Sequence, residues 1–409
     1  MLQPAHPVTL HPPTADELVA RANAMIPWLR ERAASIEAER CVPGDVIQAF
    51  QDAGFFRILQ PRAWGGWEMD PEVFWRVLME LGRGCCNSAW NMMILGVHQW
   101  EIPQVSDQAM HDVWGSAPTC ITASSYSAFG TITEVEGGYR LHGTWRSSSG
   151  CDHADWAFIG GMVKDDAGLP ADHCAFLVPA SQFRIEDDWY AFGLCGTGSK
   201  SLILDNVFVP LHRVHSIVHY QLSDRAAPYL LPFRAAFCGS VSAVICGFAQ
   251  GAIDTFTEQM QVRTNTNNGV KAALSPYVRD RLGNAVARVR GARARLFGLL
   301  QECRAYTERS QLVPDALRVQ HSLDMARVGR ECEEAVLLLY KSLGARGIMS
   351  DNPFQRFLRD TLAATNHITQ NADDNAGNLG GYLLGTDEPP FLLKPRIPFA
   401  QVRRCHPVV

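Results

Sequence analysis

The sequence predicts an α+β fold in three consecutive parts: an N-terminal helical domain, a central β-domain and a C-terminal helical bundle. Residues 15–38 are rich in Ala, Glu, Arg and Leu, which favour a helix. Residues 131–136 alternate between polar and apolar side chains, which is typical of a half-buried strand. Residues 282–303 and 325–343 repeat apolar side chains at helical spacing. The expected domain boundaries are 1–118, 119–225 and 226–409.

The composition is that of a globular chain with little net charge. The 409 residues include 37 Lys and Arg against 42 Asp and Glu, which gives a formal net charge of −5. Hydrophobic residues make up 47% of the chain, which argues against a largely disordered protein. The mild acidity gives no support for nucleic-acid binding. The arginine-rich segment 279–295 is therefore interpreted as a solvated or inter-subunit helix face.

The cysteines and the N-terminus bear on the cellular compartment. The chain has 12 cysteines without a CxxC pair, a pattern typical of reduced, buried thiols. Residues 1–15 contain four prolines and no apolar run, so we expect no signal peptide. We also expect no membrane segment, because no run approaches the roughly 20 apolar residues of a spanning helix. These observations predict a cytoplasmic protein.

The first part is expected to be a series of helices separated by glycine and proline. After the helix over 15–38, a Pro-Gly pair precedes a helix over 45–53, which Gly54 is expected to close. A loop rich in Pro and Gly follows over 61–67. Two further helices are expected over 71–82 and 88–98.

The character of the sequence changes near residue 120. Gly137 and Gly138 separate the strand over 131–136 from a second strand over 139–145, which predicts a β-hairpin. Further short strands are expected over 157–163, 174–179 and 201–210. Short strands in this number predict a small antiparallel barrel or sandwich. The long amphipathic helices that follow it predict a four-helix bundle.

Three local motifs occur in a fixed order along the chain. They are Gly54-Phe55-Phe56-Arg57 with residues 61–66, the segment 141–150, and the segment 192–199 with the strand that ends at Pro210. In these motifs, and in the order α–β–α, the chain resembles the acyl-CoA dehydrogenase fold. The resemblance extends from Arg21 to Gly385.

A second set of residues narrows this resemblance. The set comprises Trp90, residues 96–100, residues 149–156, residues 196–199, and Arg359-Asp360 followed by His367. In this set the chain is similar to the oxygenase components of two-component flavin-dependent monooxygenases, relatives of the 4-hydroxyphenylacetate, hydroxysteroid-phenol and polyketide hydroxylases.

One departure separates the chain from most acyl-CoA dehydrogenases. Those enzymes use a carboxylate base, usually a Glu shortly after an Arg-Asp pair, whereas residues 361–385 contain no Glu. A subset of dehydrogenases carries this Glu on another helix, so the sequence also allows an acyl-CoA dehydrogenase. It further allows a member of the superfamily that oxygenates nitrogen or sulfur, and a catalytically inactive scaffold.

The resemblance implies a reaction and its partners. Reduced FMN or FAD would come from a separate NAD(P)H-flavin reductase and react with O₂ to give a C4a-hydroperoxide. This intermediate would hydroxylate a phenolic or polycyclic aromatic substrate at the ortho position. The protein would shield the peroxide from water and deprotonate the phenol. The resemblance also implies a homotetramer.

The resemblance further assigns residues to the flavin. Ser149 matches a hydroxyl that lies against flavin N5, and Ser124, or its neighbour Ser125, matches a second flavin-contacting serine. Trp90 would lie along the flavin or substrate pocket. Arg263 is similar to an arginine that reaches the flavin phosphate across a subunit interface, and a guanidinium suits phosphate oxygens.

Histidines are the candidates for proton transfer. By resemblance, His367 would act as the general base towards the phenol, since an imidazole titrates near working pH. His98 is a second candidate that could hydrogen-bond the substrate or the peroxide, and His153 is expected to be structural. No metal site is expected, because Cys151-Asp152-His153 has no second ligand pair at zinc spacing.

Overall fold

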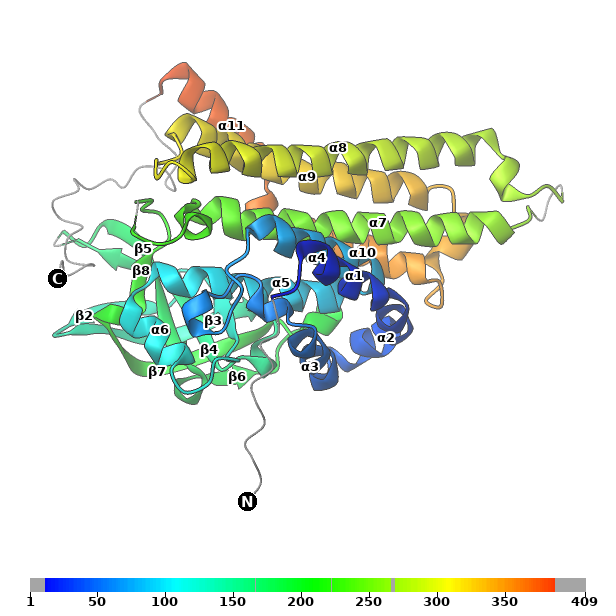
Figure 1. Ribbon diagram of the computed structural model, residues 1–409. Coiled ribbons are helices and arrows are strands. Elements are labelled where there is room, and N and C mark those ends of the chain that lie inside the picture. Colours follow the sequence, from blue (N-terminus) through cyan, green and yellow to red (C-terminus); the bar gives the residue numbers. More distant parts are fainter. Residues whose placement is uncertain (1–11, 166, 222, 266–268, 387–409) are drawn as a thin grey trace.

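The computed structural model describes residues 12–165, 167–221, 223–265 and 269–386. The start of the predicted first domain and the end of the predicted last domain lie outside the described residues. Figure 1 shows the bundle helices in the upper part of the molecule, the β-domain at lower left and the helices of residues 15–52 at lower right. The N-terminal helices are α1 (Ala15–Ala24), α2 (Ile26–Glu39), α3 (Gly44–Asp52), α4 (Pro71–Gly84), α5 (Cys86–Glu101) and α6 (Asp107–Trp114). The observed order of helices, strands and helices confirms the predicted architecture.

Local chemistry explains where the first helices begin and end. At the start of α1, Thr14 and Glu17 form a capping box, in which each side chain accepts the other residue's backbone N–H. The single helix predicted over 15–38 is divided at Met25, because Pro27 lacks the N–H that a continuous helix needs. Gly54 follows α3 with φ 81°, which confirms its predicted role at the helix end.

The β-domain consists of two four-stranded sheets, in the orders β1-β4-β5-β8 and β2-β3-β7-β6. The strands are β1 (Thr122–Ser125), β2 (Thr131–Val135), β3 (Gly138–Ser148), β4 (Trp156–Lys164), β5 (Pro170–Pro179), β6 (Arg184–Glu186), β7 (Lys200–Pro210) and β8 (Val214–Ser216). The predicted hairpin is confirmed, since β2 pairs antiparallel with β3. The expectation of antiparallel pairing is wrong for β1 and β4, which are parallel. Between them the chain crosses to the other sheet, and it returns to the first in its original direction.

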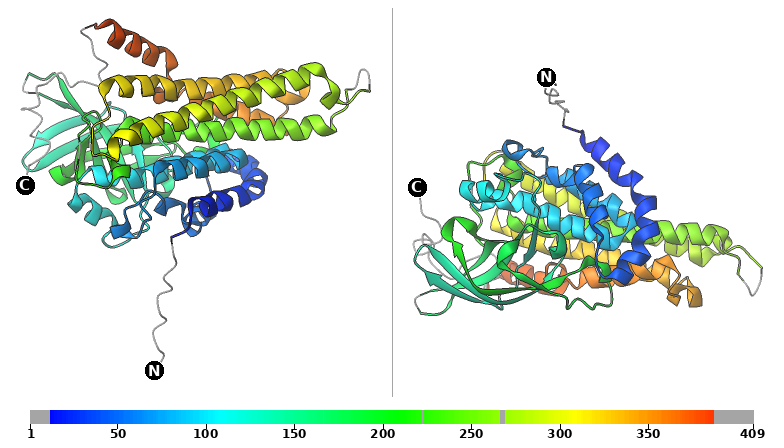
Figure 2. Two further views of the ribbon diagram at one scale, coloured as in Figure 1. Left: turned by 45° about the horizontal axis from the view of Figure 1, so that its top comes forward. Right: turned by 90° about the horizontal axis from the view of Figure 1, so that it is seen from below.

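The C-terminal part confirms the predicted bundle. Its helices are α7 (Gly239–Val262), α8 (Pro276–Thr307), α9 (Asp315–Tyr340) and α10 (Pro353–Thr365), and α11 (Ala372–Leu384) packs on α9. The left view of Figure 2 shows α7, α8 and α9 running side by side. Most of the apolar positions predicted to form the core, such as Val289 and Leu296, are buried, and Leu282 is partly buried.

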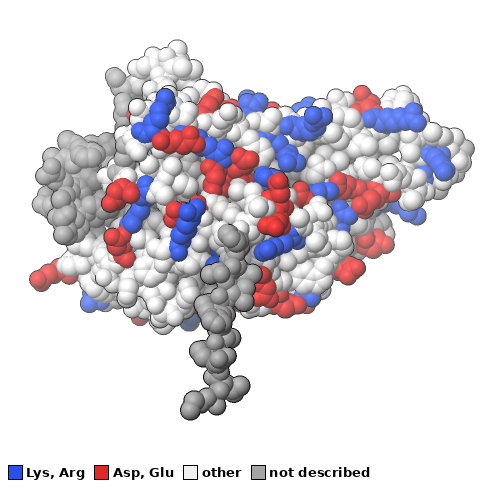
Figure 3. All heavy atoms as spheres, viewed as in Figure 1, with Lys and Arg blue, Asp and Glu red and all other residues white. Residues whose placement is uncertain are grey.

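Two arginines of α8 lie beside carboxylates of α9. Arg288 is 2.6 Å from Glu334, and Arg295 is 3.0 Å from Asp324. Figure 3 shows basic and acidic side chains interspersed over the visible face of the molecule. Some of the described arginines of this segment therefore form ion pairs with α9, an arrangement that a solvated helix face allows.

One expectation about membranes needs correction. The segment Arg234–Val262, which contains α7 and the π-helical turn η9 (Arg234–Cys238), is long and apolar enough to cross a membrane by length and composition. In this structure, however, 94% of its most apolar window is buried inside the protein. Packing of α7 against α4, α8, α9 and α10 accounts for its apolar composition.

Helix α5 connects the parts of the fold. All its residues from Cys86 to Glu101 are buried, because α5 contacts α4, α7 and β1. Polar side chains on such a helix need partners, since an unpaired buried polar group costs about 1–3 kcal/mol. The partners of Trp90 and His98, two turns apart on α5, define the candidate site.

Candidate functional site

A chain of buried hydroxyl groups begins at Trp90. The indole Nε1 of Trp90 donates to Ser149 Oγ at 3.0 Å, and Ser149 Oγ lies 2.7 Å from Ser199 Oγ. Ser199 Oγ lies in turn 2.6 Å from Thr197 Oγ1, which donates to the carbonyl of Leu194 at 2.8 Å. The structure thus places two sequence-predicted residues, Trp90 and Ser149, in direct contact.

The carbonyl group at the end of this chain of hydroxyl groups fixes the direction of each hydrogen bond in it. The carbonyl of Leu194 can only accept, so the single hydroxyl hydrogen of Thr197 is used there. Ser199 must then donate to Thr197, and Ser149 must donate to Ser199. Trp90 occupies one of the two lone pairs of Ser149 Oγ. One lone pair of Ser149 therefore remains to accept a hydrogen bond from a bound molecule.

The turn after β3 presents Ser149 to α5. Gly150 has φ 70°, a left-handed conformation that strains residues with a side chain, and its N–H donates to Thr197 O at 3.1 Å. A Cβ on Gly150 would also lie only 3.1 Å from the Leu95 side chain. Beside this turn, both amide atoms of Asn91 are buried without a hydrogen-bond partner among the described residues. Asn91 thus adds a free donor and a free acceptor next to Trp90.

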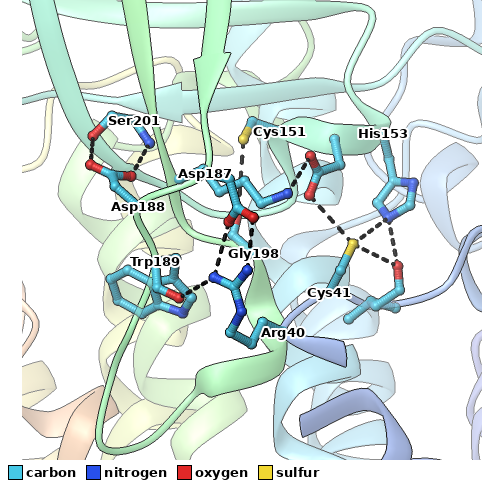
Figure 4. Close-up of polar contacts among 12 residues, drawn as sticks. Arg40, Cys41, Cys151, His153, Asp187, Asp188, Trp189, Gly198 and Ser201 are labelled. Atoms are coloured by element: carbon cyan, nitrogen blue, oxygen red, sulfur yellow. Dashed lines mark hydrogen bonds and ion pairs between the residues drawn. The ribbon is translucent and has the colours of Figure 1, made fainter. Parts of the chain in front are cut away.

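Figure 4 shows the contacts that fasten this turn to the N-terminal helices. His153 Nε2 lies 2.7 Å from the carbonyl of Val42, so His153 has the structural contact expected of it. Lys200 Nζ donates to Asp152 at 2.9 Å. The Cys41 thiol, 3.3 Å from Asp152, is not a reactive nucleophile, because burial and the Asp152 carboxylate raise its pKa to about 12.

A second set of contacts in Figure 4 fixes the segment that leads to Ser199. Arg40 donates through two nitrogens to Asp187, at 3.0 and 2.7 Å, and also to the carbonyl of Trp189. Asp188 accepts hydrogen bonds from the N–H and the hydroxyl of Ser201. The two segments that carry Ser149 and Ser199 are therefore held by charged groups on their outer side.

His367 lies beside the hydroxyl chain. Its ring packs edge-on against Trp90, with 5.9 Å between the ring centroids. It caps the turn η12 (Ile368–Gln370), where Nδ1 accepts the N–H of Thr369. Although part of the residue is exposed, burial of the ring lowers the pKa of His367 to about 4. His367 is therefore neutral near pH 7, with its hydrogen on Nε2.

His98 belongs to a different polar cluster, with Glu101, Tyr126 and His215. His98 Nδ1 is 2.7 Å from one carboxylate oxygen of Glu101, and Tyr126 donates its hydroxyl to the same oxygen. The other oxygen lies 2.9 Å from His215 Nε2. Burial alone would raise the pKa of Glu101, but hydrogen bonds from His215 and His98 lower it to about 2. Glu101 is thus a buried, ionised carboxylate.

The remaining sequence-predicted residues lie further from these contacts. Ser124 is buried on β1, whereas the hydroxyl of its neighbour Ser125 donates to the carbonyl of Arg146 at 2.6 Å. Arg263 follows α7 and donates to Leu343 O at 2.9 Å. It lies 15 residues beyond Phe248, the α7 residue next to Trp90, which corresponds to about 22 Å of helix. Within one chain, Arg263 is therefore apart from the hydroxyl chain.

Sequence reasoning missed several polar residues of the site. The segment 196–199 contributes only to the resemblance and gives Thr197 and Ser199 no role of their own, and no sequence pattern assigns a role to Asn91, Glu101 or His215. The spacing of His98 and Glu101, one helical turn apart, was the one available signal. Among the described residues, no group of three or more His, Cys, Asp or Glu side chains is arranged so that it could hold a metal ion.

Asp360 joins the bundle to the loop of the hydroxyl chain. Its Oδ1 accepts the N–H of Leu194 at 2.7 Å, and burial raises its pKa to about 7. An Asp with a raised pKa in the folded state stabilises the fold below its ordinary pKa, and this contribution is lost as the pH rises through about 7. We expect Asp360→Asn to keep the neutral form, so its Tm relative to wild type should rise between about pH 4 and 7.

Thermal unfolding at several pH values checks this prediction. Asp373→Asn is the matched control, because Asp373 is exposed on α11 and should not change the pH dependence of Tm. A Tm difference between Asp360→Asn and wild type that does not vary with pH would contradict the account of Asp360.

Comparisons with known proteins agree with this architecture. Residues 22–109 match the family model described as acyl-CoA dehydrogenase, N-terminal domain, and residues 240–372 match that of the C-terminal domain. The flavin-dependent monooxygenase, oxygenase subunit HsaA, of Rhodococcus jostii (strain RHA1) is 36% identical over 86% of this chain and 94% of that protein. The p-hydroxyphenylacetate 3-hydroxylase, oxygenase component, of Acinetobacter baumannii is 29% identical over 96% of both chains.

Solved structures extend the likeness to three dimensions. The crystal structure of 3-HSA hydroxylase from Rhodococcus sp. RHA1 superposes with a TM-score of 0.87 and 34% identity, over 93% of this chain and 100% of that chain. XiaF from Streptomyces sp., in complex with FADH2 and glycerol, gives a TM-score of 0.83 and 25% identity, over 94% and 97%. The chain therefore belongs to the family of flavin-dependent monooxygenase oxygenase subunits, which is built on the acyl-CoA dehydrogenase fold.

Proposed function

We propose that this oxygenase subunit hydroxylates a phenolic or polycyclic aromatic substrate ortho to its hydroxyl group, by way of a flavin C4a-hydroperoxide. In this proposal, reduced FMN or FAD arrives from a separate NAD(P)H-flavin reductase, and O₂ is the co-substrate. The active form is a cytoplasmic homotetramer, in which Arg263 reaches the flavin phosphate of a neighbouring subunit. The names of the relatives support the substrate class, because they include a p-hydroxyphenylacetate hydroxylase and a resorcinol hydroxylase.

The observation that carries this proposal is the free lone pair of Ser149. Reduced flavin has an N–H at N5, so it offers the donor that this acceptor lacks. A chain of hydrogen bonds that runs in one direction, from Trp90 to the carbonyl of Leu194, keeps Ser149 in this orientation. The unpaired amide of Asn91 supplies a further donor and acceptor at the same place. Ser124 is proposed as a second flavin contact, on β1.

The two histidines are proposed to have different tasks. His98 is buried, and its Nε2 has no partner among the described residues, while its Nδ1 faces the carboxylate of Glu101. This geometry favours His98 as the acceptor of the phenolic proton. His367 has its Nδ1 occupied by Thr369 and is neutral, so it suits the task of donating a hydrogen bond near the flavin. The structure therefore favours His98 for the role of base that the sequence interpretation gave to His367.

An isotope experiment tests the proposed function. The protein is mixed with reduced FMN or reduced FAD, ¹⁸O₂ and a panel of phenols that includes 4-hydroxyphenylacetate and resorcinol. We expect a product that carries one ¹⁸O atom ortho to the existing hydroxyl. Oxygen on nitrogen or sulfur of a heteroaromatic compound, with no phenol oxygenated, would favour an N- or S-oxygenase. Anaerobic reduction of bound flavin by acyl-CoA thioesters would favour a dehydrogenase and overturn the proposal.

A further inference from the structure

The carboxylate of Glu101 has three hydrogen-bond donors and is almost completely shielded from solvent. Two of them are the imidazoles of His98 and His215, which lie 2.7 and 2.9 Å away, and the third is the hydroxyl of Tyr126. Glu101 is 1% exposed and His98 is 0% exposed. A buried carboxylate stays ionised only when charges and hydrogen bonds compensate its lost hydration. The hydrogen bonds from these three neighbours therefore keep Glu101 ionised. The ionised carboxylate in turn decides which ring nitrogens of the two histidines carry hydrogen.

The hydrogen-bond inventory assigns the ring hydrogens of His215. Its Nδ1 lies 3.1 Å from the carbonyl oxygen of Ser216, and its Nε2 faces Glu101. Both of these partners can only accept when Glu101 is ionised, so both ring nitrogens of His215 must carry hydrogen. His215 is then an imidazolium, and it is the counter-charge of Glu101.

The same inventory applied to His98 gives a different result. His98 Nδ1 faces the carboxylate of Glu101, which requires a hydrogen on Nδ1. His98 Nε2 is buried and has no partner in the described part of the chain. The ring is held in place by Phe237, stacked at 5.8 Å between centroids, and by Phe158 at 5.5 Å. In the neutral ring, Nε2 therefore presents a lone pair.

We propose that Glu101 is a positioning residue, which holds His98 in the tautomer with hydrogen on Nδ1 so that Nε2 receives the phenolic proton, and that His215 keeps Glu101 ionised. This inference rests on the proposed function for its catalytic consequence. In the transfer, the phenol O–H bond breaks and an N–H bond forms at His98 Nε2. The products are a phenolate and an imidazolium, whose positive charge lies next to the carboxylate of Glu101.

Nitrogen NMR of the full-length protein, labelled with ¹⁵N-histidine and free of flavin and substrate, tests the inference. The signals of His98 are those that disappear in His98→Gln. In wild type we expect hydrogen on Nδ1 and a bare Nε2 at neutral pH. In Glu101→Gln, the amide group can donate to Nδ1, so we expect the other tautomer of His98 to become populated. Wild-type His98 with a bare Nδ1, or an unchanged tautomer in Glu101→Gln, would overturn the inference.

The catalytic consequence has a second readout. With reduced flavin, O₂ and a phenol that wild type hydroxylates, we expect Glu101→Gln to lower the yield of product per flavin by roughly 10–100-fold, the range known for metal-ligating imidazoles that lose their outer hydrogen-bond partner. H₂O₂ should replace the lost product, while the oxidation rate of the flavin stays unchanged. If Glu101 has a purely structural role, the substitution should instead lower the yield of product and the oxidation rate of the flavin together.

Controls separate this inference from general damage. Glu302→Gln removes the charge from a similar contact, between Glu302 and His321 in the bundle at 2.7 Å, and should change neither the His98 signals nor the product yield. If Glu101→Gln does not fold, His215→Gln tests the same cluster, because it removes the counter-charge and should also disturb the His98 tautomer. A tautomer set by Glu101, without hydroxylation of any phenol, would overturn the proposed function and leave the assignment of the cluster intact.

Discussion

Ser149→Ala is expected to convert the oxygenase into an enzyme that mainly releases H₂O₂. The substitution removes the acceptor for the flavin N5–H and leaves the indole of Trp90 without its partner. Removing one partner of a buried hydrogen bond costs about 1–3 kcal/mol, which corresponds to a lifetime shortened roughly 5- to 100-fold. Stopped-flow absorbance measures the lifetime of the oxygen adduct, and a peroxidase assay measures the H₂O₂ that is released.

The chain contains a matched control for this variant. Trp75 Nε1 donates to Ser240 Oγ at 3.0 Å, which repeats the Trp90–Ser149 contact in the core between α4 and α7. Ser240→Ala is therefore expected to cost similar stability and to leave the adduct lifetime unchanged. Ser199→Ala should have an intermediate effect, because it frees the hydroxyl hydrogen of Ser149 but keeps its oxygen. A wild-type lifetime in Ser149→Ala would show that Ser149 is only structural.

His98→Asn is expected to separate oxygen activation from hydroxylation. The variant lacks the nitrogen that accepts the phenolic proton, and positioned proton transfer contributes about 10²–10⁴-fold to a rate. We expect the product-forming step to slow by roughly 100-fold or more, while reduced flavin still reacts with O₂ at the wild-type rate. Single-turnover kinetics with a phenol, combined with product analysis, measure the two steps separately.

A comparison with His367→Asn shows which of the two histidines acts as the base. Because burial lowers the pKa of His367 to about 4, its ring stays neutral over the working range and should add no step to the pH profile above that value. We expect His367→Asn to shorten the adduct lifetime more than it slows proton transfer. If His367→Asn abolishes hydroxylation and His98→Asn does not, then His367 is the base and our distribution of roles is wrong.

The sequence was informative wherever local patterns decide the structure. The hairpin at Gly137 and Gly138, the helix end at Gly54 and the periodic core of α8 and α9 could all be predicted. The break at Met25 could have been found too, since Pro27 follows it closely. By contrast, the parallel pairing of β1 with β4 depends on where the chain returns between two sheets, which no local pattern records.

The candidate site also contains residues that the sequence could predict and contacts that it could not. The resemblance named Trp90 and Ser149, and the structure finds them in contact across 59 positions of sequence. Ser199, 50 residues from Ser149, and His215, 114 residues from Glu101, could not be paired with their partners from the sequence. The identity of the proton acceptor depends on such long-range contacts, because the ring of His367 packs against Trp90 whereas the ring of His98 faces the carboxylate of Glu101.

The most direct test of the central claim is the lifetime of the oxygen adduct in the wild-type protein. The protein is mixed anaerobically with reduced FMN or reduced FAD, and then with O₂, in a stopped-flow spectrophotometer. Our account predicts an intermediate with the absorbance of a C4a-hydroperoxide that outlives the adduct of free flavin and decays faster when a phenol that becomes hydroxylated is added. Direct reoxidation of both flavins, with no such intermediate, would contradict it.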